Sequence, residues 1–266
     1  MLAWFFSATA WPMEAKLPYS PFHLILTAAG CALAVYCALW CARSPRIRPS
    51  RLLASCGLSL ALLELYKQGF LWEIVFRHTY NWWYFPFQLC SVPMYLCLLY
   101  PFFPGRQKRF ATFLQDFGLL GGIMALAVPD GLLHPYWALT LHGFFWHFML
   151  IFLGLYCRQK NLADPLANGF LRMLPLYFFC CALASVLNTI IQFLPGQHAY
   201  ADLFYINCFF PSEQPVFRQI SLMFGNLWGH LAYLFASCLG AWAIHRICGR
   251  TGTFCKSTLP ARRHGD

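Results

Sequence analysis

The sequence carries little charge for its length. Only 11% of its 266 residues are charged, whereas soluble proteins average about 25%, and 59% are hydrophobic. So few ionic side chains cannot cover the surface of a soluble domain of this size, and a soluble globular fold is therefore excluded. Most of the exterior must face hydrocarbon. At ~20 residues per crossing, a chain of this length has room for roughly seven transmembrane helices.

Sequence signs of metal, cofactor and nucleic-acid binding are also lacking. The 13 cysteines include no C-x-x-C pair, so we expect no zinc site, and nearly all lie in apolar runs, so we expect no disulfide framework. No glycine-rich nucleotide loop is present, and we expect no cofactor. The net charge of +10 comes from short Lys and Arg clusters without a stripe of stacking aromatics, so we expect no nucleic acid as a partner.

What the sequence does have is a series of apolar runs of nearly membrane length. They predict an all-α polytopic membrane protein built as a seven-transmembrane-helix bundle. The predicted spans cover residues 22–42, 52–71, 84–103, 110–128, 136–157, 173–194 and 220–245. Residues 1–21 are predicted to form an external or interfacial lead-in, residues 22–245 the transmembrane domain, and residues 246–266 a basic cytoplasmic tail.

The basic residues predict the orientation of this bundle. Of the 19 Lys and Arg residues, 15 lie in alternate connections or in the C-terminal tail. Cytoplasmic loops hold the excess of positive charge in membrane proteins. We therefore expect the N-terminus outside and the C-terminus in the cytoplasm.

Polar side chains inside the predicted spans mark a candidate site, because such groups are costly at membrane depth and usually line a cavity or pathway. By this topology most of them lie in the outer half of the membrane: Glu64, Gln68, Gln88, Cys90, His142, His147, Asn188, Asn226 and His230. Asp116 lies nearer the other side. Their shared depth favours one lined cavity over separate interhelical hydrogen bonds, which contribute roughly 0.6 kcal/mol each.

The third predicted span contains a candidate nucleophile. Pro86 suits the first turn of a helix, and Pro93 removes an amide hydrogen, so we expect a break in the helix beside Cys90. A histidine within hydrogen-bond reach could accept the thiol proton, and the thiolate could then form a thioester with an acyl chain. The alternative is a kinked helix with an inert buried thiol.

Several of these stretches resemble a known family. Residues 85–95, 118–130 and 144–155, with residues 20–24 at the start of the first span, are similar to the YwaF-like family of bacterial integral membrane proteins. That family shares its fold with a eukaryotic transmembrane acyltransferase linked to ether-phospholipid remodelling and ferroptosis. The resemblance implies a location in the bacterial inner membrane and an active pair at Cys90 and His147. Gln88 departs from the family, in which a histidine is common at that position.

Two histidines compete as the base. Equal helix depth favours His142, whereas the resemblance favours His147, and we choose His147. We expect the remaining groups to bind substrate: His142, Glu64, Gln88, Asn188, Asn226 and His230. The leading hypothesis is a cysteine-dependent acyltransferase that acts on membrane phospholipid. The rivals are a non-enzymatic lipid or small-molecule binding protein or transporter that uses the same cavity, and an assembly subunit without a ligand.

Overall fold

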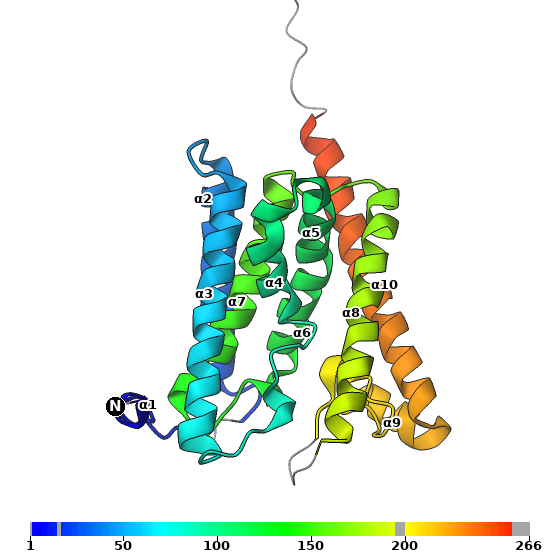
Figure 1. Ribbon diagram of the computed structural model, residues 1–266. Helices are drawn as coiled ribbons and strands as arrows, with labels where there is room; N and C mark the ends of the chain where they lie inside the picture. The colour runs from blue at the N-terminus through cyan, green and yellow to red at the C-terminus, as the bar shows by residue number, and fades with distance from the viewer. Residues whose placement is uncertain (1, 15–16, 195–199, 257–266) are drawn as a thin grey trace, which may run out of the picture.

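The computed structural model describes residues 2–14, 17–194 and 200–256, and these residues form an all-helical protein (Figure 1). Within these ranges the β-structure consists of one isolated antiparallel bridge between Pro12 and Tyr136, which ties the lead-in to the start of α7. The predicted basic tail, residues 246–266, lies outside the described residues from residue 257 onward. The predicted all-α class is confirmed.

The α-helices differ widely in length. They are α1 (Leu2–Ala8), α2 (Pro21–Arg43), α3 (Pro49–Phe70), α4 (Val92–Leu99), α5 (Gln107–Phe113), α6 (Leu119–Ala127), α7 (Trp137–Gln159), α8 (Ala167–Gln192), α9 (Pro215–Phe224) and α10 (Asn226–Lys256). Two π-helical turns, η1 (Leu71–Val75) and η5 (Leu114–Gly118), extend α3 and join α5 to α6. Short 3-10 turns lie at Trp82–Tyr84, Tyr100–Phe102, Pro104–Arg106, Pro129–Gly131 and Leu203–Tyr205.

Proline starts several of these helices, because its fixed φ suits the first turn and its missing amide hydrogen has no intrahelical partner there. Pro21 begins α2, with the Ser20 hydroxyl accepting from the His23 amide as an N-cap. Pro49 begins α3 and Pro215 begins α9. The sequence thus places the helix starts where a proline follows a polar residue.

The seven predicted spans correspond only in part to membrane-length helices. Among the described residues, five helical segments are long and apolar enough to cross a membrane: Pro21–Arg43, Pro104–Ala127, Trp137–Gln159, Ala167–Gln192 and Asn226–Gly249. The helix α3 has 22 residues but carries Arg51, Glu64 and Lys67. The number of crossings and their orientation stay predictions.

The third span differs most from the sequence prediction. Its predicted first half is not helical, since α4 begins only at Val92 and the apolar helical stretch runs from Val92 to Phe102. Pro93, not Pro86, occupies the first turn. The helix therefore does not break beside Cys90 but starts two residues after it, and Cys90 lies in a turn.

The last span also starts later than predicted. The expected helix over residues 220–245 is divided at Gly225, whose φ of +96° is a conformation that side-chain-bearing residues rarely adopt. The helix α9 ends at Phe224, and α10 begins at Asn226 and packs back against α9.

The interior of the bundle is formed by α5, η5, α6 and α7, while α2, α8 and α10 lie outside and expose apolar side chains (Figure 1). An exposed apolar surface of this extent fits contact with lipid. The outer helix α2 packs along α7, where the ring of Phe148 covers Gly30 and leaves no room for a Cβ. A Cβ at Gly122 on α6 would lie 3.1 Å from the carbonyl oxygen of His147, so this glycine lets α6 approach α7 closely.

The connections rich in basic residues meet at one end of the bundle, called here the basic end and formed by residues 44–48, 103–106 and 160–166. At this end the Lys160 ammonium donates to the carbonyl oxygens of Ala42 and Ser44, both at 3.1 Å. The end of α10 lies there too, and α1 and α9 lie at the opposite end (Figure 1). This grouping agrees with the alternation of charge along the sequence.

Candidate functional site

A charged cluster on the second half of α3 forms the centre of the candidate site. Lys67 pairs with the buried Glu64 one turn earlier, with Nζ and Oε1 2.8 Å apart. The Gln68 amide donates to the same carboxylate oxygen at 2.7 Å and to the carbonyl oxygen of Tyr84 at 2.7 Å. Glu64 is only 5% exposed, so these partners compensate for the loss of its hydration.

Cys90 lies beside this cluster in the turn that precedes α4. Its carbonyl oxygen accepts a hydrogen bond of 2.9 Å from the indole Nε1 of Trp146 on α7. Its half-buried thiol lies within electrostatic range of Lys67 and Glu64. Burial of the thiol disfavours the thiolate form most strongly, the Lys67 ammonium favours it, and the Glu64 carboxylate disfavours it.

The two candidate bases, His142 and His147, lie on α7, and both are within electrostatic range of Lys67. In His147, Nδ1 is 2.7 Å from the carbonyl oxygen of Gly143. A carbonyl only accepts, so Nδ1 carries the hydrogen and Nε2 is the proton-accepting nitrogen of the neutral ring. His142 packs on Trp146 with ring centroids 5.5 Å apart, and among the described residues its buried Nε2 has no hydrogen-bond partner.

The connections around the cluster complete its surroundings. His134, before α7, is also within electrostatic range of Lys67, and burial lowers the pKa of its ring. Its backbone amide and carbonyl are both bonded to the hydroxyl of Thr140. On the other side, burial and the nearby Glu64 carboxylate raise the pKa of Tyr80 to about 12. Both side chains are therefore neutral at physiological pH.

Residues 200–214, called here the cap loop, lie at the end of the bundle opposite the basic end. Gln88 and Asn188 each hold the cap loop through both atoms of their amide groups. Gln88 donates to the Asp202 carbonyl and accepts from the Phe204 amide at 3.0 and 2.8 Å. Asn188 donates to the Leu203 carbonyl and accepts from the Leu203 amide, also at 3.0 and 2.8 Å.

The two polar groups of α10 contact the same loop. Asn226 donates to the carbonyl oxygen of Cys208 at 3.2 Å. His230 lies against the backbone of Phe210 and is 6% exposed. Inside the loop, Phe204 and Tyr205 have positive φ angles of 60° and 55°, which costs energy for side-chain-bearing residues. The contacts from the bundle hold this conformation.

The predicted site residues thus fall into two groups. Glu64 is paired with Lys67, and Cys90, His142 and His147 lie within electrostatic range of the same ammonium. Gln88, Asn188, Asn226 and His230 instead contact the cap loop. Lys67 itself was missed, because the sequence topology counts it as an external charge. The signal that could have found it is the i, i+3 spacing to Glu64 on one helix face.

A second buried ionic pair lies near the basic end. Asp116 in η5 and His245 on α10 are joined by a 2.8 Å contact between Oδ2 and Nδ1. Asp116 is the polar residue that the sequence analysis places nearer the other side of the membrane. Among the described residues, no group of three or more His, Cys, Asp or Glu side chains is arranged to hold a metal ion.

Long apolar helices, a lipid-facing apolar surface and a buried polar cluster define this chain as an all-helical integral membrane protein. Its sequence matches the TMEM164 family over residues 4–244, and the chain therefore belongs to that family of transmembrane proteins. No curated protein and no solved structure matches it. The narrower resemblance to YwaF-like proteins stays a prediction.

Proposed function

We propose that this protein is a cysteine-dependent acyltransferase of membrane phospholipid, with Cys90 as the nucleophile and His147 as the base. The observation that carries the proposal is the 2.9 Å hydrogen bond from the Trp146 indole to the Cys90 carbonyl, which places Cys90 beside the helix that carries both histidines. Intramembrane ionisable groups of this kind usually serve a function.

The proposed reaction has two balanced steps. The Cys90 sulfur attacks the ester carbonyl of a phospholipid while its proton passes to Nε2 of His147, and the proton then moves to the departing lysophospholipid oxygen. The acyl group now forms a thioester with Cys90. The hydroxyl of an acceptor lipid gives its proton to His147 and attacks the thioester, and the sulfur recovers a proton as it leaves.

The charged residues on α3 have supporting roles in this scheme. Lys67 favours the thiolate of Cys90 and the negative oxygen of the tetrahedral intermediate. Glu64 holds the Lys67 ammonium at 2.8 Å and thereby fixes its position. The proposed contribution of Glu64 to substrate binding is this positioning, together with attraction for a positive head group.

The four residues that hold the cap loop are proposed to contact substrate when the loop opens. In the closed arrangement the amides of Gln88 and Asn188 are occupied by the backbone of residues 202–204. Release of the loop would free these amides, together with Asn226 and His230, for phosphate or carbonyl oxygens of the lipid. The proposed location is the bacterial inner membrane, with the cap loop on the external side.

His142 is the second candidate for the base, because its buried Nε2 has no hydrogen-bond partner among the described residues and could accept a proton. The two assignments predict different variants to be inactive. If His147 is the base, His147→Ala abolishes turnover and His142→Ala reduces it only in part; the reverse result would assign the role to His142.

The test measures acyl transfer between labelled phospholipid and lysophospholipid by the purified full-length protein in lipid nanodiscs. We expect Cys90→Ala and His147→Ala to be about equally inactive and the double variant no worse, because such residues act as a unit. Cys208→Ala, which removes an exposed thiol from the cap loop, is the matched control and should keep full activity. Full turnover by Cys90→Ala would end the proposal.

The same variants test the non-enzymatic alternative. A lipid-binding protein or transporter closed by the cap loop would bind or move lipid equally well with Ala or Ser at position 90. Lipid binding retained in Cys90→Ala, with no acyl transfer by the wild-type protein, would favour that function.

A further inference from the structure

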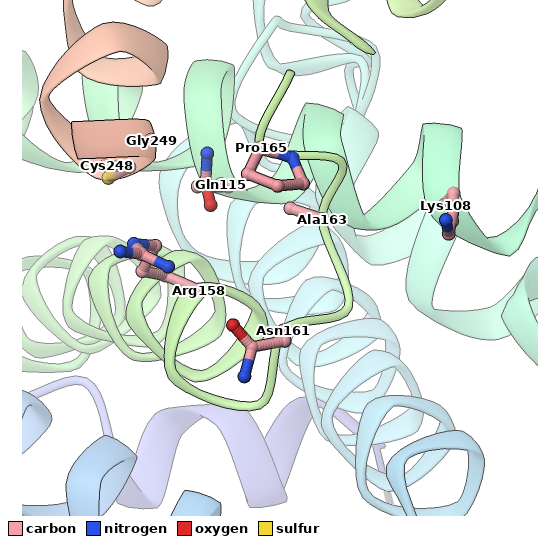
Figure 2. Close-up of a pocket in the computed structure, with 8 residues that line it drawn as sticks. All are labelled: Lys108, Gln115, Arg158, Asn161, Ala163, Pro165, Cys248 and Gly249. Atoms are coloured by element: carbon pink, nitrogen blue, oxygen red, sulfur yellow. The ribbon is translucent and has the colours of Figure 1, made fainter. Parts of the chain in front are cut away.

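A pocket of about 260 Å³ opens at the basic end of the bundle, remote from Cys90 (Figure 2). Lys108 on α5 and Arg158 at the end of α7 contribute its two charged side chains, and Asn161 comes from the connection between α7 and α8. Cys248 on α10 and Gln115 in η5 complete the polar lining. Arg158 is 11 residues beyond His147, or roughly 16 Å along the helix, so the pocket and the proposed catalytic site are separate.

The lining has the chemistry of an anion site. Lys108 and Arg158 reach the pocket from different helices, and Figure 2 shows them on opposite sides of Ala163, with Asn161 nearer to Arg158. None of the eight described residues that line it is acidic. Arginine offers a planar fork of donors that matches phosphate oxygens, and lysine adds a mobile positive charge.

Two carboxylates close in sequence to the pocket residues, Asp116 and Asp164, each have a partner outside the pocket lining. Asp116 contacts His245 Nδ1, and the Nε2 of the same ring is 2.9 Å from the carbonyl oxygen of Leu166 and must donate to it. The Asp116–His245 pair therefore shares one further proton and carries no net charge. Asp164 accepts from the Leu166 amide and lies 3.9 Å from Arg172.

The walls of the pocket are held in place by the same contacts. His245 on α10 joins η5, through Asp116, to the connection after α7, through Leu166. The hydroxyl of Thr112 on α5 accepts from the Asp164 amide at 3.0 Å and fixes that connection again. A site built before its ligand arrives loses less conformational freedom on binding.

We propose that this pocket binds a phosphate group. The phosphate of an anionic phospholipid and that of a soluble phosphate ester share the chemistry that Lys108 and Arg158 recognise. The pocket lies where α7 ends and α5 begins, which is the depth of lipid head groups, and basic pockets between transmembrane helices bind anionic head groups. This site is independent of acyl transfer at Cys90, so either proposal can fail without the other.

The test compares two neighbouring basic residues, Lys108 and Arg109, in the full-length protein. Lys108→Gln removes a pocket charge, whereas Arg109→Gln removes the same charge from the adjacent exposed residue, which does not line the pocket. Thermal unfolding is followed in micelles of dodecyl maltoside, a detergent without phosphate, titrated with phosphatidylglycerol and separately with sn-glycerol 3-phosphate. We expect a ligand to raise the unfolding temperature of the wild type, and Lys108→Gln to weaken apparent affinity about tenfold, with Arg109→Gln close to wild type.

Arg158 provides a second comparison. Arg158→Gln should weaken binding at least as much as Lys108→Gln, and Arg158→Lys should restore part of it because the charge returns without the planar fork. Since Lys108 is exposed, Lys108→Gln keeps the test decisive even if the Arg158 variants fail to fold.

The two ligands separate the possible sources of the phosphate. Stabilisation by phosphatidylglycerol alone assigns a lipid head group, and stabilisation by sn-glycerol 3-phosphate as well assigns a site that accepts a soluble ester. An equal loss of apparent affinity in Lys108→Gln and Arg109→Gln would mean that the ligands bind through general surface charge, and would overturn the proposal. So would a wild-type protein that neither ligand stabilises.

Discussion

The indole nitrogen of Trp146 donates a hydrogen bond of 2.9 Å to the carbonyl oxygen of Cys90. The two residues are 56 positions apart, and the bond joins the turn before α4 directly to the helix that carries both candidate histidines. Since Cys90 lies in a turn and not in a helix, this contact fixes a backbone that has no helical ladder of its own. The position of the thiol therefore depends on α7.

Removing this bond should impair the reaction without unfolding the protein. Trp146→Phe keeps an aromatic ring beside His142 but loses the donor, which contributes about 0.5–1.5 kcal/mol, and we expect roughly 3–10-fold slower acyl transfer. Labelling of the Cys90 thiol by maleimide should become faster as the turn loosens. Trp40→Phe, at a lipid-facing residue that is 61% exposed, is the control. Unchanged turnover and labelling in Trp146→Phe would contradict this role.

The ion pair on α3 should show strong coupling. Lys67→Met leaves the buried Glu64 carboxylate without its cation and should destabilise the protein by about 1–3 kcal/mol. Glu64→Gln combined with Lys67→Met removes both charges and should recover most of that loss. Thermal unfolding in detergent measures each change, with Arg51→Met, at an exposed residue of the same helix, as the control. Additive effects of the two substitutions would show that the pair is not coupled.

The cap loop should be loosened by changes in the bundle beneath it. Gln88→Ala and Asn188→Ala remove the acceptors of the Phe204 and Leu203 amides, so peptides that contain these residues should exchange hydrogen faster, by about tenfold for each 1.4 kcal/mol lost. Hydrogen–deuterium exchange with mass spectrometry measures this effect. Asn226→Ala removes a donor to a carbonyl and should leave these two amides protected.

The cap loop should also respond to pH through Asp202. Burial raises the pKa of this carboxyl group to about 7, from an ordinary value of 3.8. The folded state therefore binds the proton more tightly than the unfolded state, so the contribution to stability is complete below about pH 4 and is lost as the pH rises through 7. Asp202→Asn cannot ionise and should be more stable than the wild type at pH 8 by a few kcal/mol, but not at pH 4.

Thermal unfolding across this pH range checks the prediction. Asp130→Asn changes an exposed carboxylate outside the cap loop and serves as the control. A constant difference between Asp202→Asn and the wild type from pH 4 to pH 8 would mean that Asp202 does not titrate in this range.

The orientation of the bundle is tested by reporter fusions after Arg109 and after Arg263. The grouping of residues 44–48, 103–106 and 160–166 at one end, together with the positive charge of these connections, leads us to expect cytoplasmic signals from both fusions. A fusion after Cys208 in the cap loop should report the other side. An external signal after Arg109 would reverse the orientation.

The sequence predicts the long helices well because their signal is local. Apolar runs of membrane length identify α2 and α7 within about two residues, whereas α8 begins at Ala167, six residues before its predicted start. The third span was misread because both Pro86 and Pro93 suit a helix start, and only tertiary contacts decide between them. The hydrogen bond from Trp146 to the Cys90 carbonyl and the one from the Tyr95 hydroxyl to the Pro86 carbonyl stabilise the non-helical segment.

The candidate site was predictable only where its residues share a helix or a depth. Glu64, Cys90 and the α7 histidines were found because a polar group at membrane depth stands out in an apolar run. The partners of Gln88 and Asn188 could not be read from the sequence, because they are backbone groups of a loop 15 to 116 residues away. Depth alone does not distinguish a side chain that faces substrate from one that holds a loop.

Because α2 packs against α7, α2 cannot reach its native packing until α7 has been synthesised. About 90 residues separate the end of α2 from the start of α7, so at ~5–20 residues per second the ribosome delivers the partner helix only after ~5–20 s. Until then, the surface around Gly30 lacks the Phe148 ring, and the His23 Nε2 lacks its acceptor, the carbonyl of Leu126. The helix α2 therefore waits for its main packing partner while α3, α4, α5 and α6 are synthesised.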